Sequence, residues 1–248
     1  MRTLSIIGYG PFSKLLIQNM QDDFDILVYS RDPQSKQQGS LRFRFVPLAE
    51  ALGCKHVILG MPAQFIGSFL EKNAELINPD AFVMDVASVK QQPLVDMERY
   101  LPKTCQIIGT HPIFGPGSAK NGIAGLRIVL CPSRCQPATL QKLRAYLESK
   151  GLIVLEKLPD EHDKAMAYVL GLTQYIGRAL QAIDAHDTEL TTPAYEDLMD
   201  MRRIQGNDSW DMFCSIMTLN PYAQKVMQQL RQAFAMLDKQ LTAEKEKQ

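Results

Sequence analysis

The sequence predicts an α/β domain with a mostly parallel sheet, followed by an all-helical domain, and three observations support this. Short apolar segments typical of buried strands alternate with amphipathic helical segments up to residue 157. A glycine-rich turn directly follows the first of these strands. From residue 158 to residue 248 the chain has helical periodicity and almost no strand signal. We therefore expect one domain over 1–157 and a second over 158–248.

The strands of the first domain are predicted from short runs of aliphatic residues. Such runs suit strands that are covered by helices on both faces of a sheet. The predicted strands cover residues 3–7, 25–29, 56–59, 82–84, 106–108, 127–130 and 152–155, with one helix after the first strand and another over 63–76.

The turn after the first strand, Gly8-Tyr9-Gly10-Pro11-Phe12, is typical of a Rossmann-type dinucleotide-binding domain. Gly8 allows a tight turn, and Gly10 allows a pyrophosphate to approach the backbone at the helix N-terminus. Ser13 stands where the usual fingerprint has its third glycine, so we expect weaker packing of this helix against the strand. We assign residues 8–12 to cofactor binding.

The end of the second strand bears on which cofactor binds. NAD-selective folds usually carry an acidic residue here, which holds the ribose 2′-hydroxyl. This chain has Ser30 and Arg31 instead, and a guanidinium suits a 2′-phosphate. The pattern favours NADP, although Asp32 is able to serve the ribose of NAD. Met61 and Pro62, which follow the third strand, are further cofactor-binding candidates.

The segment Gly109-Thr110-His111-Pro112-Ile113-Phe114-Gly115-Pro116 is the most informative part of the chain. A neutral imidazole accepts a proton near pH 7, because its ordinary pKa is about 6.5. Glycines and prolines restrict the backbone around His111. We expect His111 on a turn at the carboxyl edge of the sheet, where it is a candidate general base. A purely structural turn histidine is the alternative.

Composition excludes several classes of partner. The chain has 248 residues, 46% of them hydrophobic, and a formal net charge of +0 without a basic tract, so nucleic-acid binding is not expected. No apolar run reaches the roughly 18 residues of a membrane span, and we expect a cytoplasmic protein. The five cysteines are read as reduced thiols, and Cys131 and Cys135 lack the spacing of a zinc site, so we expect no metal.

Several further segments stand out beside the Gly8 turn and the His111 segment. They are Asp85-Val86-Ala87-Ser88-Val89-Lys90, Asn121-Gly122, Ala124-Gly125-Leu126, Glu161-His162-Asp163 and Ser209-Trp210-Asp211. Taken together, these segments resemble the prephenate and arogenate dehydrogenase family, and the resemblance spans nearly the whole chain. The details that look closest to the NADP-using arogenate branch are Ser30-Arg31, Lys120-Asn121-Gly122 and Asn207-Asp208-Ser209-Trp210-Asp211.

This resemblance implies the oxidative decarboxylation of arogenate to tyrosine, a step of aromatic amino acid biosynthesis. A hydride passes from the hydroxyl-bearing ring carbon to NADP, carbon dioxide is lost, and the ring becomes aromatic. By resemblance His111 accepts the hydroxyl proton, and Ser88 lies beside it, bonded to the substrate hydroxyl or the nicotinamide. Ser88 as a helix cap is the alternative. We expect Lys90 to support the loop or the cofactor, and His162 to be a helix N-terminal residue.

The candidate substrate-binding residues are Lys120, Gln174, Arg178 and Asp208, with Arg202 and Arg203 as further cations. Gln174 and Arg178 are four residues apart and share a helix face. Many family members have histidine at Gln174, and some bacterial members have arginine at Asp211. Arogenate carries an ammonium group, which Asp208 can bind, unless Asp208 merely caps a helix. Arogenate is therefore the expected substrate, and prephenate, which gives 4-hydroxyphenylpyruvate, is the alternative.

An apolar stripe is predicted on the first helix of the second domain, formed by Tyr168, Leu172, Ile176, Ala179 and Ile183. Long apolar helices without a sheet beside them often bury a second face in another subunit. We therefore expect a homodimer that forms through the helical domain.

Two other functions stay open on the sequence. One is an unrelated NADP-dependent oxidoreductase of the β-hydroxyacid dehydrogenase type, which carries a catalytic lysine on the long interdomain helix. Lys164 lies too close to the start of that helix for this role. The other is a nucleotide-binding regulator without turnover, which would lack the base or its neighbour, whereas His111 and Ser88 are both present.

Overall fold

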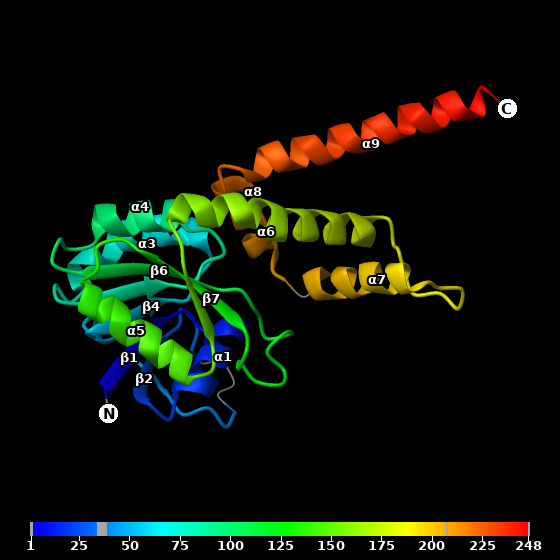
Figure 1. Cartoon of the computed structure of the whole chain (residues 1–248). Helices are drawn as coiled ribbons and strands as arrows, with labels where there is room; N and C mark the ends of the chain where they lie inside the picture. The colour runs from blue at the N-terminus through cyan, green and yellow to red at the C-terminus, as the bar shows by residue number, and fades with distance from the viewer. Residues whose placement is uncertain (1, 34–38, 207, 248) are drawn as a thin grey trace. The chain divides into compact units, whose positions relative to one another are not determined.

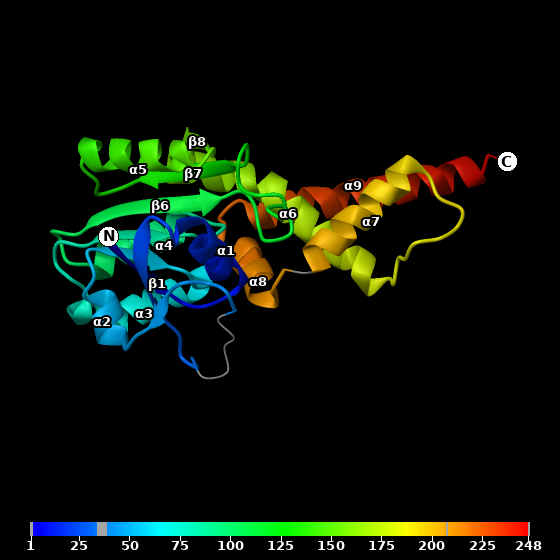
Figure 2. The ribbon, with the colours of Figure 1, turned by 90° about the horizontal axis from the view of Figure 1, so that it is seen from below.

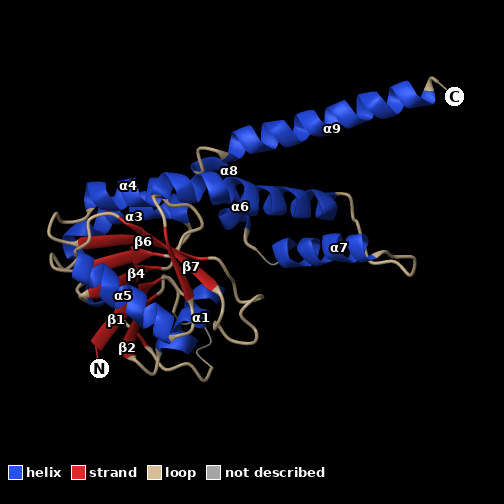
Figure 3. Cartoon of the chain, viewed as in Figure 1, coloured by secondary structure: helices blue, strands red, loops and turns tan. Residues whose placement is uncertain are grey.

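A computed structural model describes residues 2–33, 39–206 and 208–247. The chain forms two compact units, Met1–His162 and Asp163–Gln248. All strands of the described chain lie in the first unit, and the second unit is helical (Figure 3). The predicted fold class, an α/β domain followed by a helical region, is confirmed.

The first unit is built on an eight-stranded sheet with the order β3-β2-β1-β4-β5-β6-β7-β8 (Figure 1). Neighbouring strands are parallel except β6 and β7, which are antiparallel, so the predicted mostly parallel sheet is confirmed. The strands are β1 (Arg2–Ile7), β2 (Phe24–Tyr29), β3 (Arg44–Phe45), β4 (His56–Leu59), β5 (Phe82–Asp85), β6 (Gln106–Pro112), β7 (Arg127–Pro132) and β8 (Ile153–Glu156).

Helices cover both faces of this sheet. On one face lie α1 (Pro11–Met20) and α5 (Pro137–Ser149), whose apolar side chains join the strands in one core. On the other lie α2 (Leu48–Leu52), α3 (Ile66–Asn73) and α4 (Gln91–Tyr100), with α3 beside α4 (Figures 1 and 2). The 3-10 turns η1 (Ala63–Phe65) and η2 (Ala74–Leu76) flank α3.

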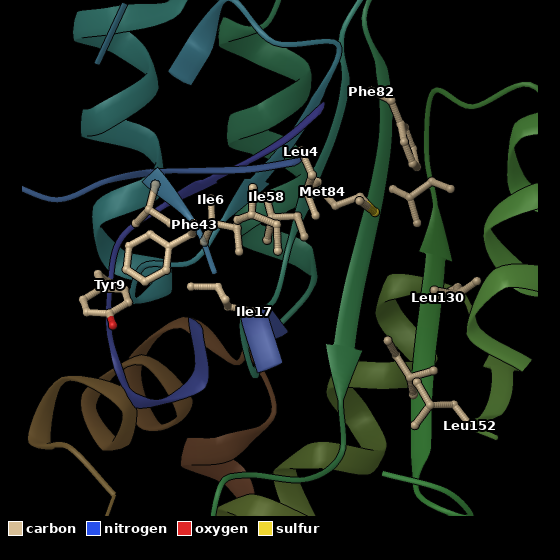
Figure 4. Packing of buried hydrophobic residues seen from close by; sticks show 14 of the residues in the cluster. Leu4, Ile6, Tyr9, Ile17, Phe43, Ile58, Phe82, Met84, Leu130 and Leu152 are labelled. Carbon is tan, nitrogen blue, oxygen red and sulfur yellow. The ribbon is translucent and has the colours of Figure 1, made fainter. Parts of the chain in front are cut away.

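The core between the sheet and helices α1 and α5 uses alternate residues of each strand. Leu4 and Ile6 of β1, Ile58 of β4 and Met84 of β5 belong to this one cluster (Figure 4). Alternate side chains of a strand point to the same face, so this spacing follows from strand geometry. The core holds β1, β4 and β5 in register, and their carboxyl ends therefore meet at one edge of the sheet.

The prediction of a turn at Gly109 to Pro112 is wrong, because these residues form the second half of β6. Antiparallel pairing with β7 overrides the local glycine and proline signals, and it places His111 opposite Val129. The residue stays at the carboxyl edge nonetheless. Asp85, the last residue of β5, pairs with Gly109, so β6 extends beyond β5 by the three residues that include His111.

The second unit packs around the apolar sides of three helices. Ala167, Ile216, Met217, Ala223, Val226 and Met227 form its buried cluster. No helix in the described part of the chain is long and apolar enough to cross a bilayer. The helices are α6 (Pro159–Ala182), which begins in the first unit, α7 (Pro193–Gly206), α8 (Trp210–Leu219) and α9 (Ala223–Lys245).

The apolar stripe predicted on α6 is not its buried face. Tyr168 and Ile183 are 52% and 74% exposed. The buried side instead combines Met166 and Ala167 with Gly171, Gln174 and Gly177. A Cβ atom on Gly177 would lie 2.8 Å from the side chain of Gln205 in α7, so the absence of a side chain lets the two helices approach closely. Hydrophobicity alone does not identify such a face.

Candidate active site

Gly8 shapes the turn between β1 and α1. Its φ is +109°, and a Cβ atom there would lie 2.5 Å from the carbonyl oxygen of Gly60. Its N–H donates to the carbonyl of Tyr29 at 2.9 Å, and the N–H of Gly60 donates to that of Ile7 at 2.9 Å. Glycine is therefore required here by both its backbone conformation and the space available.

Gly10 leaves the N-terminus of α1 open. It is the N-cap residue, it makes no side-chain cap, and nothing lies within 4 Å of where its Cβ atom would be. Pro11 follows in the first turn, where the missing N–H costs nothing. The remaining N–H groups of the first turn form the positive end of the helix dipole and are available to an anion, so the site fits a pyrophosphate.

Ser13 does not loosen the packing of α1, contrary to the prediction. Its side chain is buried, and its Oγ lies 2.9 Å from where a Cβ atom of Gly60 would be. The missing side chain at Gly60 makes the room that a glycine at position 13 usually provides. Helix and sheet therefore still approach closely, with the glycine at the position that follows β4.

Tyr9 and Phe12, two of the predicted cofactor-binding residues, have aromatic neighbours. The ring of Tyr9 packs on Phe43, at 5.1 Å between ring centroids (Figure 4). It also packs on Phe45 at 5.3 Å, and burial raises the pKa of its hydroxyl. Its side chain therefore belongs to the core. Phe12 lies 6.2 Å from Phe114, which joins the start of α1 to the segment after β6.

The other cofactor candidates lie at the same edge of the sheet. Ser30 is half-buried and Arg31 is exposed, and both directly follow β2. Met61 and Pro62 follow β4 beyond Gly60 and are half-buried. These positions surround the carboxyl ends of parallel strands, where dinucleotides bind in open α/β sheets.

His111 meets a second histidine. Its Nδ1 lies 2.8 Å from Nε2 of His162, which is in the first turn of α6, and the rings meet edge to face. The two residues are 4% and 2% exposed. The helical position of His162 agrees with the sequence analysis, but its contact with the candidate base was not predicted.

Lys90 lies in a buried ion pair next to this histidine pair. It is 0% exposed, and its Nζ donates to Oδ2 of Asp85 and, at 2.7 Å, to the carbonyl of Thr110. Asp85 also accepts from the N–H groups of Ala87 at 2.9 Å and Thr110 at 3.2 Å. The network therefore ties the loop that contains Ser88 to the residue before His111.

The surroundings lower the pKa of His111 well below its ordinary 6.5. Burial is the main cause, and the nearby His162 and the charged Lys90 act in the same direction. A buried imidazole avoids the charged form because water no longer solvates it. His111 is consequently neutral near pH 7, the state in which it can accept a proton.

Ser88 is half-buried in the loop between β5 and α4. The N-cap of α4 is Lys90, so the alternative interpretation of Ser88 as the cap of that helix is wrong. Because β5 and β6 are neighbours, Ser88 follows the strand next to the one that carries His111.

Three of the four predicted substrate residues come together in the second unit. Gln174 is fully buried, and its Nε2 donates to Oδ2 of Asp208. Arg178 donates to the carbonyls of Asp208 at 2.9 Å and Ser209 at 3.2 Å. Burial raises the pKa of Asp208, and Gln174 and Arg178 oppose that rise. The N-cap of α8 is Ser209, so Asp208 is not the cap.

This cluster has unsatisfied polar atoms. Oε1 of Gln174 and Nε of Arg178 are buried without a hydrogen-bond partner among the residues that the structure describes. The guanidinium of Arg178 packs over Trp210 and Phe213, at 5.3 and 4.8 Å from the ring centroids. Arg178 is therefore fixed by its own neighbours, and one acceptor and one donor beside Asp208 remain open.

Lys120 is exposed in the loop between β6 and β7. Asn207 lies outside the described residues. Within the part of the chain that the structure describes, no group of three or more His, Cys, Asp or Glu residues could hold a metal ion.

Sequence reasoning missed the partners of His111 and Lys90. The segment from Asp85 to Lys90 contains both members of the buried ion pair, and a lysine that follows a buried strand was the available signal. No comparable signal linked His162 to His111, because 51 residues separate them.

An extended parallel sheet with a glycine turn, an open helix N-terminus and polar residues at its carboxyl edge defines a dinucleotide-binding α/β protein. A family model described as prephenate dehydrogenase, nucleotide-binding domain, matches residues 15–155. A second model, described as TYRAAT1-like, C-terminal domain, matches residues 179–248. The chain therefore belongs to the prephenate dehydrogenase family of NAD(P)-dependent oxidoreductases.

Relatives carry names from both branches of this family. Arogenate dehydrogenase 2, chloroplastic, of Arabidopsis thaliana is 27% identical over 96% of this chain and 69% of its own length. A probable arogenate/prephenate dehydrogenase of Methanocaldococcus jannaschii is 24% identical over 90% of this chain, which matches only 53% of that relative.

Solved structures share the fold. Prephenate dehydrogenase from A. aeolicus, in complex with hydroxyphenyl propionate and NAD+, aligns with a TM-score of 0.77 and 20% identity, over 99% of this chain and 92% of that one. Synechocystis arogenate dehydrogenase aligns with a TM-score of 0.69 and 22% identity, over 98% and 93%.

Proposed function

We propose that this protein is an NADP-dependent arogenate dehydrogenase, which converts arogenate to tyrosine by oxidative decarboxylation. The observation that carries the choice of substrate is the buried carboxylate of Asp208 beside the unpaired Oε1 of Gln174. Names of relatives support the reaction, since two matched proteins of Arabidopsis thaliana are called arogenate dehydrogenases.

His111 is the proposed proton acceptor. When bound, the nicotinamide accepts a hydride from the ring carbon that bears the hydroxyl group. Nε2 of His111 takes the hydroxyl proton, so the carbon–oxygen bond becomes a carbonyl. The ring carboxylate then leaves as carbon dioxide, and its electron pair makes the ring a phenol after the oxygen regains a proton. A positioned base of this kind is typically worth about 10²–10⁴-fold in rate.

Asp208 and Gln174 are the proposed ammonium site. An ammonium group donates three hydrogen bonds, and the cluster presents a carboxylate and an unpaired amide oxygen. A keto oxygen at the same place would instead face the carboxylate of Asp208 and Oε1 of Gln174. Both are acceptors, so neither would donate a hydrogen bond to it. The open Nε–H of Arg178 is a candidate donor to a substrate carboxylate.

The preference for NADP rests on Arg31 and Ser30, which follow β2 where NAD-selective folds place an acid. Gly8, Gly10 and the first turn of α1 would hold the pyrophosphate. Ser88 is proposed to bond the substrate hydroxyl or the nicotinamide.

A homodimer stays a prediction, and α9 supports it. Phe234, Leu237 and Leu241 are more than half exposed and recur at helical spacing, which suits a helix that packs on another copy. Light scattering during gel filtration measures the mass directly. The predicted cytoplasmic location is untested, and the matched plant proteins are named chloroplastic.

The test is nicotinamide reduction by the purified protein with arogenate or prephenate, each with NADP+ or NAD+. We expect the highest kcat/KM for arogenate with NADP+. Faster turnover of prephenate would keep the family chemistry and overturn the role of Asp208. If NADP+ still binds but no combination is turned over, the protein would be another kind of oxidoreductase or a nucleotide-binding regulator.

A further inference from the structure

The contact between His111 and His162 joins two segments that lie far apart in the sequence. His111 is the penultimate residue of β6, and His162 is in the first turn of α6. Nδ1 of the first lies 2.8 Å from Nε2 of the second, and both rings are buried. Nε2 of His111 has no hydrogen-bond partner among the described residues. Within the described chain, the hydrogen bond of the His111 ring is therefore made at Nδ1.

Two neutral imidazoles at this distance share one hydrogen, and its position decides what His111 can do. If Nε2–H of His162 donates to Nδ1, the hydrogen of His111 must be on its Nε2. His111 could then not accept a proton at the open nitrogen. If Nδ1–H of His111 donates to Nε2 of His162, the open Nε2 of His111 keeps its lone pair. Only the second arrangement provides a base.

The start of α6 holds His162 where it can accept. The residue lies in the first turn of the helix and is 2% exposed. Its backbone N–H donates to the carbonyl of Leu158 at 3.0 Å, which fixes the start of the helix. A neutral imidazole at this position accepts through Nε2 when that nitrogen carries no hydrogen.

We propose that His162 is a positioning residue that accepts Nδ1–H of His111 and thereby holds the base in the tautomer whose Nε2 is open. The proposal rests on the proposed function of His111. In the reaction the hydroxyl proton moves to Nε2 of His111, and Nδ1–H continues to donate to His162. No proton needs to reach His162 itself.

The experiment combines two variants with one spectroscopic signature. His162→Leu removes the acceptor, whereas the side-chain oxygen of His162→Gln can still accept Nδ1–H. We expect kcat to fall about 10- to 100-fold in His162→Leu, the range of a lost buried hydrogen bond, with KM nearly unchanged. His162→Gln should recover most of kcat. His56→Leu, a half-buried histidine of the same unit, is the matched control and should keep kcat within about twofold.

The tautomer is read from ¹⁵N chemical shifts of the imidazoles with NADP+ and no substrate. The signals of His111 are those lost in His111→Asn. We expect wild-type His111 to carry its hydrogen on Nδ1, and His162→Leu to shift the population toward Nε2–H. A hydrogen on Nε2 in the wild type, or an unchanged kcat in His162→Leu, would overturn the proposal. If wild type fails to turn over arogenate but keeps the Nδ1–H tautomer, the proposed function falls while the pairing stands.

Discussion

The two polar clusters of this protein differ in whether all of their buried polar atoms have hydrogen-bond partners. In the first unit, Asp85, Lys90 and Thr110 form a closed network beside His111, and no buried side-chain nitrogen or oxygen of these residues lacks a partner. In the second unit, Gln174 and Arg178 each keep one buried polar atom without a partner. One cluster is complete without ligand, and the other is not.

This difference indicates separate roles. A base must be held in one orientation and one protonation state before the substrate arrives, and a satisfied buried network does that. A recognition site gains selectivity from groups that are costly to leave unpaired, because only the right ligand completes them.

The largest effect is expected for His111→Asn. The amide preserves a polar contact at the position of Nδ1 and removes the open Nε2, so kcat should fall by about 10²–10⁴-fold. Binding of NADP+, measured by fluorescence titration, should change little. His56→Asn is the matched control. A fall in kcat of less than about tenfold would remove His111 from the role of base.

Lys90→Met should destabilise the first unit most. It leaves the buried carboxylate of Asp85 without its cation, which typically costs about 3–5 kcal/mol. Unfolding in urea measures this directly. Adding Asp85→Asn to the variant should recover part of the loss, because the uncompensated charge disappears. Arg144→Met breaks partly exposed pairs with Glu148 and Glu156, each of which typically contributes about 0.2–1 kcal/mol. Equal losses in the two single variants would contradict the closed network.

Asp208→Asn should reduce the preference for arogenate. Loss of a charge-assisted hydrogen bond of about 1.5–3 kcal/mol corresponds to about a 10- to 100-fold fall in kcat/KM for arogenate relative to prephenate. Asp211→Asn makes the same charge change at an exposed position three residues later. An unchanged ratio of the two substrates in Asp208→Asn would refute the ammonium site.

The smallest effect concerns pH and stability. His111 has a lower pKa in the folded protein than its ordinary 6.5, so below that pH the unfolded chain binds a proton that the folded protein does not. This term is fully present above pH 6.5 and is lost as pH falls toward the folded pKa. We expect His111 to account for about 1 kcal/mol of stability lost between pH 6.5 and 5.5.

Comparison of wild type with His111→Asn isolates this term from the titration of carboxylates. The variant should lose less stability on acidification, whereas His186→Asn, an exposed histidine, should behave as wild type. Parallel pH profiles for wild type and His111→Asn would show that the pKa of His111 is not lowered.

Sequence reasoning worked where a local pattern determines the structure. Gly8 and Gly10 predicted the turn and the open start of α1, because few backbone conformations are possible there. Sequence reasoning failed where contacts with a distant segment determine the local structure. Pairing with β7 turned Gly109 to Pro112 from an expected turn into strand, and the two-residue strand β3 has no periodicity to detect.

The candidate site shows the same limit. Gln174 and Asp208 were predicted to serve one function, and the structure brings them into contact. The closed network was missed for two reasons. Some of its partners are distant in the sequence, and Lys90 is fully buried, which is rare for a lysine. On α6 the buried face includes two glycines and a glutamine beside Met166 and Ala167, and hydrophobicity does not reveal those three positions.

The most direct test of these assignments is a crystal structure of the protein with NADP+ and tyrosine, the proposed product. We predict the phenolic oxygen within hydrogen-bonding distance of Nε2 of His111, with the histidine pair keeping its contact. Tyrosine bound with His111 turned away from the phenol would contradict the assignment of His111 as the base.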